Sequence, residues 1–298
     1  MTLAGGRRAI LVYLLATWGF SGLFYFLIIR SVGTNAAGGA YVSGLMWCPA
    51  LGALITCRYL GRPIASLGWQ WGQTRYQVLS YLIPLGYSSL TYSIAWSVGF
   101  AGLNPAQTAD AFSRFFGIGA LPGPVGVGLY FLMVATIGVI QNCATTLGEE
   151  IGWRGFLVPE LAKHFSFTST AVLSGAIWAV WHMPIIIFGG FNVGTGWWGL
   201  AIVSVNMIVL CFVMTWLRLK SGSLWTGVIL HASSNHFIQH FFDPMSAYSG
   251  RTRYIVGEFG AGFTLVAALF AAYFWMRRGE VAQPRYGERA EVVKTAAR

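Results

Sequence analysis

The chain has 298 residues, of which 56% are hydrophobic, 16% aromatic and only 9% charged. Soluble domains carry about 25% charged residues, so this composition excludes a soluble monomeric domain. The net charge of +10 is explained by Lys and Arg gathered on one side of a membrane and attracted to an anionic leaflet. No basic cluster sits on a soluble domain, which excludes nucleic acid as an expected partner.

Runs of about 20 apolar residues, the helical length that crosses the hydrocarbon core, predict a membrane protein throughout. The first run is too long for the apolar core of a signal peptide and is kept as a mature helix. The fold class predicted is all-α, a polytopic transmembrane helix bundle of about eight spans. The predicted spans are 10–29, 41–60, 77–101, 125–148, 168–189, 197–217, 223–242 and 257–276.

An even number of spans places both termini on the same side of the membrane. Every Lys and Arg falls on that side except Arg30, Arg114, Arg251 and Arg253. The positive-inside rule therefore predicts that both termini are cytoplasmic. Together with Gly-, Ala- and Arg-rich usage, this indicates an integral protein of a bacterial cell membrane.

Residues 1–278 are predicted to form a single integral membrane domain, and 279–298 a polar cytoplasmic tail that is expected to be disordered. Between the third and fourth spans, residues 102–124 contain Pro, Gly and aromatic residues and favour a short interfacial or re-entrant segment over a lid. His236 and His240, near the outer end of the seventh span, are expected to be interfacial polar groups.

Two adjacent carboxylates and an arginine stand at the predicted end of the fourth span. Arg154 follows Glu150 at i,i+4, a spacing that brings side chains together on a helix. An ionisable residue in the membrane is costly unless partners compensate, and is therefore a functional hypothesis. We expect Arg154 to neutralise Glu150 and to hold the end of the helix.

Histidines on two further spans complete the set of intramembrane polar groups. His182 follows Trp178 at i,i+4 in the fifth span, and Asn235 follows His231 at the same spacing in the seventh. An isolated histidine is more often a satisfied core residue. Acids and histidines on three separate helices, each with a partner one turn away, instead favour a catalytic site.

This set of motifs resembles that of the CPBP family, which comprises the type II CAAX prenyl endopeptidases and the bacteriocin-processing or immunity (Abi) proteins. Their order and helix placement match over a motif-bearing core of about residues 130–242. One departure is Trp178, where the family usually has phenylalanine. The resemblance implies an intramembrane peptidase with the catalytic residues Glu149, Glu150, Arg154, His182, His231 and Asn235.

Peptide hydrolysis requires an activated water and a stabiliser for the tetrahedral oxyanion. Glu149 is expected to be the base, His182 to orient the water and carry a proton to the leaving amine, and His231 with Asn235 to donate to the oxyanion. The family resemblance implies the same roles. Helical rise places His182 about 20 Å into its span but Glu149 near the inner end of its own. This mismatch in depth stays open, and the site is expected on the cytoplasmic half, reached from that side.

A metal is left open. Two histidines and a glutamate can hold zinc, and the family is often called a metalloprotease family, but no HExxH motif is present and a metal-free mechanism explains the residues equally well. The expected partners are the lipid bilayer and a peptide or protein substrate, either a prenylated CAAX tail or a leader peptide. One alternative is a catalytically idle scaffold or bacteriocin-immunity protein that binds a partner in the same cavity. A secondary transporter is less favoured, because the two halves of the chain show no duplication.

Overall fold

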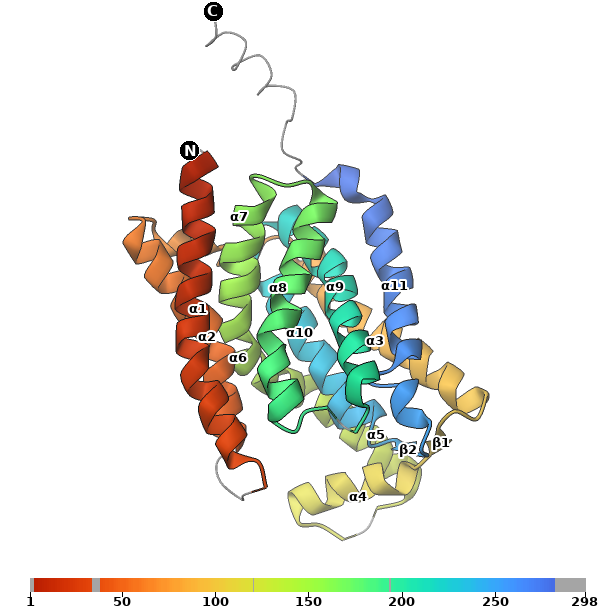
Figure 1. Cartoon of the computed structure of the whole chain (residues 1–298). Helices are drawn as coiled ribbons and strands as arrows, with labels where there is room; N and C mark the ends of the chain where they lie inside the picture. The colour runs from red at the N-terminus through yellow and green to blue at the C-terminus, as the bar shows by residue number, and fades with distance from the viewer. Residues whose placement is uncertain (1–2, 34–37, 120, 193, 282–298) are drawn as a thin grey trace, which may run out of the picture.

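The computed structural model describes residues 3–33, 38–119, 121–192 and 194–281. Long helices pack side by side over most of this range (Figure 1). The helices that form the bundle are α1 (Leu3–Ser31), α2 (Gly38–Tyr59), α3 (Thr74–Ser97), α5 (Gly123–Met133), α6 (Val139–Glu150), α7 (Val158–Ala162), α8 (Phe167–Phe188), α9 (Gly196–Ser221), α10 (Trp225–Phe237) and α11 (Ala261–Met276).

By length and composition, five helices within the described residues can cross a membrane. They are Gly6–Ser31, Gly39–Tyr59, Gly123–Ala162, Phe167–Phe188 and Gly196–Ser221. Helix α11 is apolar but shorter, and α3 and α10 coincide with the other two predicted spans. The prediction of an all-α membrane bundle is confirmed. The number of crossings and the cytoplasmic position of the termini stay predictions.

The helix that carries the acidic pair is longer than predicted. The predicted span 125–148 ends before Glu149, whereas one apolar helix continues from Gly123 to Ala162. The predicted boundary is wrong because the charged residues that follow it are buried among partners inside the protein and do not meet lipid. Two parts of this helix, η2 (Val134–Gly138) and η3 (Ile151–Leu157), are π-helical, a form found mostly as short insertions at functional sites.

Glycines allow the acid-bearing helix to approach α2 closely. A Cβ added at Gly148 would lie 2.7 Å from the Met46 carbonyl oxygen, and one at Gly152 would lie 2.6 Å from that of Pro49. Small residues four apart permit such backbone contact between membrane helices. Helices α8 and α9 also approach closely, since a Cβ at Gly175 of α8 would lie 2.5 Å from Cα of Ile208 in α9. These contacts bring the polar residues of neighbouring helices within reach of one another.

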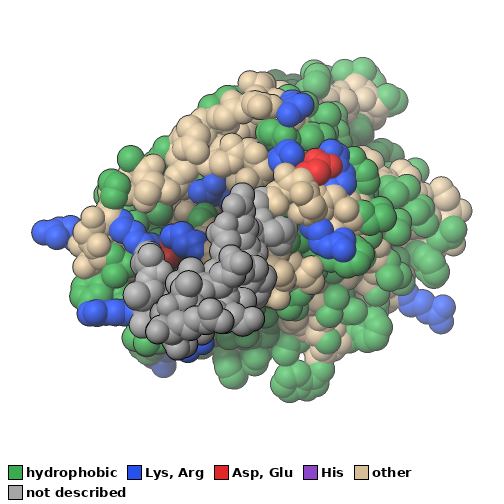
Figure 2. All heavy atoms as spheres, turned by 90° about the horizontal axis from the view of Figure 1, so that it is seen from above, with side chains coloured by type: hydrophobic (Ala, Val, Ile, Leu, Met, Phe, Trp, Pro, Cys, Tyr) green, Lys and Arg blue, Asp and Glu red, His purple; other side chains and the backbone are tan. Residues whose placement is uncertain are grey.

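The start of α1 and the end of α11 lie at the same end of the bundle (Figure 1), as an even number of crossings requires. Lys and Arg side chains are spread over this end, with few acidic side chains among them (Figure 2). Hydrogen bonds from the Arg277 guanidinium lower the pKa of Glu280 there. Counting Arg154 among these loop charges is wrong, because its side chain is only 1% exposed.

The predicted polar tail begins in an ordered turn. Residues Arg278–Glu280 form the 3-10 turn η6, and Lys220 of α9 donates to the carbonyl of Glu280 at 3.1 Å. The remainder of the predicted tail, 282–298, lies outside the described residues. Residues 279–281 are thus ordered, contrary to the prediction, and the disorder of the rest of the tail stays a prediction.

At the opposite end of the bundle, the predicted interfacial segment contains a helix, α4 (Pro105–Phe116), that packs against α5. It follows the short strand β1 (Gly102–Leu103), which pairs antiparallel with β2 (Ser246–Ala247). Phe115 and Phe116 on α4 are exposed. An amphipathic helix across the end of the bundle agrees with the predicted interfacial segment.

Candidate active site

Glu149 is held by two indole groups in the interior of the bundle. The Nε1–H of Trp178 in α8 donates to Glu149 Oε2 at 2.8 Å, and the Nε1–H of Trp153 donates to the same oxygen at 3.2 Å. The carboxylate is 2% exposed. Because neutral indoles satisfy one oxygen without cancelling the charge, Glu149 keeps the capacity to accept a proton through its other oxygen.

Glu150 accepts hydrogen bonds from two buried side chains, those of Arg154 and His231. Arg154 donates to its Oε1 at 2.7 Å, and His231 Nδ1 lies 3.0 Å from the same oxygen. The predicted i,i+4 ion pair between Glu150 and Arg154 is therefore present. A carboxylate oxygen only accepts, so His231 carries its hydrogen on Nδ1 and its ring orientation is set by Glu150.

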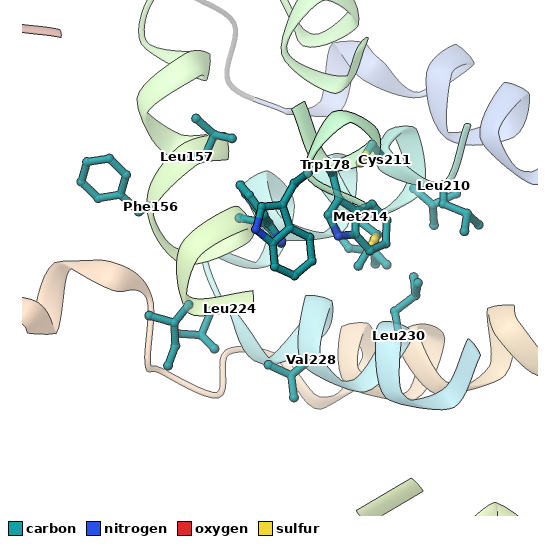
Figure 3. Packing of buried hydrophobic residues seen from close by; sticks show 14 of the residues in the cluster. Phe156, Leu157, Trp178, Leu210, Cys211, Met214, Leu224, Val228 and Leu230 are labelled. Atoms are coloured by element: carbon teal, nitrogen blue, oxygen red, sulfur yellow. The ribbon is translucent and has the colours of Figure 1, made fainter. Parts of the chain in front are cut away.

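A second guanidinium nitrogen of Arg154 contacts two sulfur atoms on α9. This nitrogen, Nη2, lies 3.2 Å from Cys211 Sγ and 2.7 Å from Met214 Sδ. The guanidinium also lies 4.6 Å from the centre of the Trp178 ring. Trp178, Cys211 and Met214 lie near one another in the packed core (Figure 3). Arg154 thus joins the acidic helix to α8 and α9, which fits the structural role predicted for it.

His182 is fixed by its own helix. Its Nδ1 lies 3.0 Å from the carbonyl oxygen of Trp178, and a carbonyl oxygen can only accept. The hydrogen is therefore on Nδ1, which leaves Nε2 available to accept a proton or to hydrogen-bond a water. The ring packs edge-on against Trp178 and Trp181, with ring centres 5.6 and 4.7 Å apart.

A cavity of about 460 Å³ connects these groups. Glu149, His182, His231 and Asn235 all line it, although they come from three separate helices. Glu150 and Arg154 do not line it, and Glu150 reaches the cavity only through His231. The structure therefore brings the six predicted residues together in two groups, one facing the cavity and one buried beside it.

Sequence reasoning missed several polar residues that line the same cavity. They are Gln141, Asn142, Thr145, Asn206, Ser234, Gln239 and Glu258. His236 and His240, predicted to be interfacial, also line it, and their ring centres are 4.4 Å apart. The i,i+4 spacing from His231 to Asn235 continues to Gln239, and this could have indicated the longer polar face. Glu258 gives no such signal, because it lies in the connection before α11.

The continuous acid-bearing helix removes the mismatch in depth. At 1.5 Å per residue, Glu149 lies about 20 Å before the end of α7 and His182 about 22 Å after the start of α8. The two side chains are therefore level. The exposed lining residues are Gln141, Phe191, Gln239 and His240. Phe191 follows α8, and Gln239 and His240 follow α10, at the end of the bundle that lies away from the chain termini (Figure 1). The rim of the cavity thus favours access from the end opposite the termini, in contrast to the predicted access from the terminal side.

Gly227 on α10 is required by the buried ion pair. A Cβ at this position would press against Glu150 Oε2 and lie 3.2 Å from Arg154 Cγ. Gly227→Ala is expected to lower the free energy of unfolding by about 1–3 kcal/mol, because the core has no space for the methyl group. Gly128→Ala is the matched control, since nothing lies within 4 Å of its Cβ. Thermal unfolding in detergent measures both, and an equal effect of the two variants would contradict the prediction.

The arrangement of donors bears on a metal. Within the described residues, no three His, Cys, Asp or Glu side chains are grouped so that they could hold a metal ion. The Nδ1 hydrogens of both histidines have acceptors, which leaves each Nε2 free to hydrogen-bond water or to act as a ligand. The chemistry proposed for this site uses only side chains of the protein and water.

Apolar helices that enclose a carboxylate, two histidines and an asparagine define an integral membrane protein with an acid–histidine site inside its bundle. Residues 127–237 match the family model described as type II CAAX prenyl endopeptidase, Rce1-like. CAAX prenyl protease 2 of Methanococcus maripaludis is 29% identical over 127 residues, which make up 41% of this chain and 44% of that protein.

The aligned region thus spans less than half the length of this curated relative. All six predicted site residues lie within the segment matched by the family model. The motif-bearing part of the chain is thus similar to the type II CAAX prenyl endopeptidases, in agreement with the resemblance found in the sequence.

Proposed function

We propose that this protein is a CAAX-type intramembrane endopeptidase that hydrolyses a peptide bond with a water activated by Glu149 and His182. The observation that carries the proposal is the convergence of Glu149, His182, His231 and Asn235 on one cavity inside the bundle. The family match supports a peptide or protein substrate. A prenyl group on the substrate, and a bacterial cell membrane as the location, are parts of the same proposal.

The contacts support a division of labour among these residues. Glu149 takes a proton from water, and the resulting hydroxide attacks the carbonyl carbon of the scissile bond. His231 and the Asn235 amide, one turn apart on α10, donate to the oxyanion. Since His231 Nδ1 is committed to Glu150, it donates through Nε2 and is then an imidazolium with Glu150 as counter-charge. His182 Nε2 accepts a hydrogen bond from the water. It then receives the proton from Glu149 and passes it to the leaving amine as the C–N bond breaks.

The proposal is tested by cleavage of quenched peptides, prenylated and unprenylated, by the full-length protein in non-ionic detergent. His231→Ala and Asn235→Ala are each expected to lower kcat by about 10²–10³-fold, the usual cost of one oxyanion donor. Activity is expected to persist in chelator, because Glu149 and His182 are proposed to activate the water without a metal. If folded wild-type protein cleaves none of the peptides, the proposal fails and an idle scaffold or immunity protein is favoured instead.

Trp178 offers a test of how Glu149 is held. Trp178→Phe keeps an aromatic ring but removes the 2.8 Å donor to Glu149 Oε2. We expect kcat to fall about tenfold with KM little changed, because a hydrogen bond to a charged group contributes about 1.5–3 kcal/mol. Trp181→Phe is the control, since its Nε1–H donates to Ser21 and not to a carboxylate. Equal losses of kcat in the two variants would mean that Trp178 contributes only packing and not a hydrogen bond that matters for catalysis.

A further inference from the structure

The cavity contains a second carboxylate that the proposed chemistry does not use. Glu258 lines the cavity together with Glu149, but it comes from the connection between β2 and α11 and lies outside the segment matched by the family model. It is therefore a feature of this chain that the catalytic motifs do not account for.

The connection that carries Glu258 is anchored. Thr252 donates to the Phe100 carbonyl oxygen at 2.8 Å, and Phe263 N–H donates to the Ile255 carbonyl oxygen at 3.0 Å. Gly257, directly before Glu258, has a φ of +75°, a left-handed conformation that glycine adopts without steric cost. The backbone therefore turns at Gly257 and sets the position of the Glu258 side chain.

Glu258 is held but not neutralised by its neighbours. Gln239 donates to its Oε1 at 3.0 Å, a neutral partner that orients the carboxyl group. No Lys or Arg is among the described residues that line the cavity. The nearby Arg154 is paired with Glu150 and lies outside the lining.

The cavity thus presents two carboxylates and four histidines around an otherwise apolar and amide-lined space. A cationic group that enters the cavity can pair with the Glu258 carboxylate, whose ionised form it stabilises through a charge-assisted hydrogen bond. An additional anionic group would meet repulsion. The charge of the lining therefore selects among substrates.

We propose that Glu258 is a specificity residue that binds a Lys or Arg side chain of the peptide substrate, a few residues from the scissile bond. This inference rests on the proposed function and deepens it by naming the substrate class. Gln239 positions the carboxylate for this contact, and Glu149 remains the base.

The experiment uses quenched peptides that are identical except for one position, occupied in turn by Lys, norleucine or Glu and moved along the peptide on either side of the scissile bond. At one position the wild-type protein is expected to cleave the Lys peptide with a kcat/KM about tenfold above that of the norleucine peptide, as a charge-assisted hydrogen bond would give. In Glu258→Gln this ratio falls to about one. In Glu258→Lys the Glu peptide becomes the preferred one.

The matched control is Asp110→Asn, which removes one negative charge from the exposed face of α4 without touching the cavity lining. It is expected to keep the wild-type preference for Lys. If Asp110→Asn loses the preference to the same extent as Glu258→Gln, the overall charge of this end of the molecule is responsible and the inference is overturned. It is also overturned if the ratio is unchanged in Glu258→Gln.

A binding measurement separates this inference from the proposed function. Fluorescence anisotropy reports the affinity of the Lys and norleucine peptides for Glu149→Gln protein with Glu258 intact or replaced by Gln. A Lys preference that depends on Glu258 supports the binding site even if no peptide is cleaved by wild-type protein, a result that would overturn the proposed function alone. Equal affinities for all peptides would overturn the inference while leaving hydrolysis unaffected.

Discussion

Replacing Glu149 by glutamine is expected to lower kcat by about 10²–10⁴-fold, the contribution typical of a positioned general base. The amide cannot take a proton from water at neutral pH, yet its carbonyl oxygen can still accept from Trp178 and Trp153. We therefore expect the variant to fold and to show the thermal unfolding of the wild-type protein. Single-turnover cleavage of the best peptide measures the loss in the chemical step.

The matched control for Glu149→Gln is Glu160→Gln. Glu160 is also buried, but it pairs with Arg62 and Lys163 at the terminal end of the bundle and does not line the cavity. The Glu160→Gln protein is expected to cleave the peptide at a rate within about twofold of wild type, because the substitution lies outside the cavity. If Glu149→Gln retained more than a tenth of the wild-type rate, the assignment of Glu149 as the base would be wrong.

Replacing Arg154 by methionine is expected to lower the free energy of unfolding by about 3–5 kcal/mol, because it leaves the Glu150 carboxylate buried without its counter-charge. Both side chains are at most 1% exposed, so water cannot compensate the lost charge. Thermal or denaturant unfolding in detergent measures the change. Lys163→Met removes a half-exposed partner of Glu160 and is expected to cost less than about 1 kcal/mol.

The double variant Glu150→Gln/Arg154→Met separates charge from packing. Removing both charges of a buried pair is often close to neutral, whereas removing one is not. We therefore expect the double variant to be more stable than Arg154→Met alone, with a coupling of about 0.5–3 kcal/mol. Strict additivity of the two single substitutions would mean that Arg154 acts mainly by packing against Trp178, Cys211 and Met214.

If the network also orients His231, the same variants carry a functional signature. Glu150→Gln keeps a carbonyl acceptor for His231 Nδ1 but removes the negative charge that stabilises an imidazolium. Loss of activity beyond any loss of folded protein would then assign to Glu150 a positioning role, acting through His231.

The membrane class, the helical fold and the likeness of the motif-bearing core to a known family could all be predicted from the amino-acid sequence. These follow from local properties: apolar runs report helices that face lipid, and residues four apart must share a helical face. For this reason the pairing of Glu150 with Arg154 could be predicted from spacing alone. The residues Glu149, His182, His231 and Asn235 could be named as a set because charged and polar groups are rare inside apolar helices.

The depth of these groups in the bundle, and the other polar residues that contact them or line their cavity, depend on how the helices pack and could not be predicted. Hydropathy treats Glu149, Glu150 and Arg154 as charges facing lipid and so ends the fourth span at residue 148. In the structure Glu150 pairs with Arg154 and two indoles donate to Glu149, and the helix continues to Ala162. The contact of Trp153 with Glu149 and that of Glu258 with the cavity depend on helix packing and on an anchored connection. Such contacts leave no periodic signal in the sequence, because they join residues whose proximity is set by the packing of other helices.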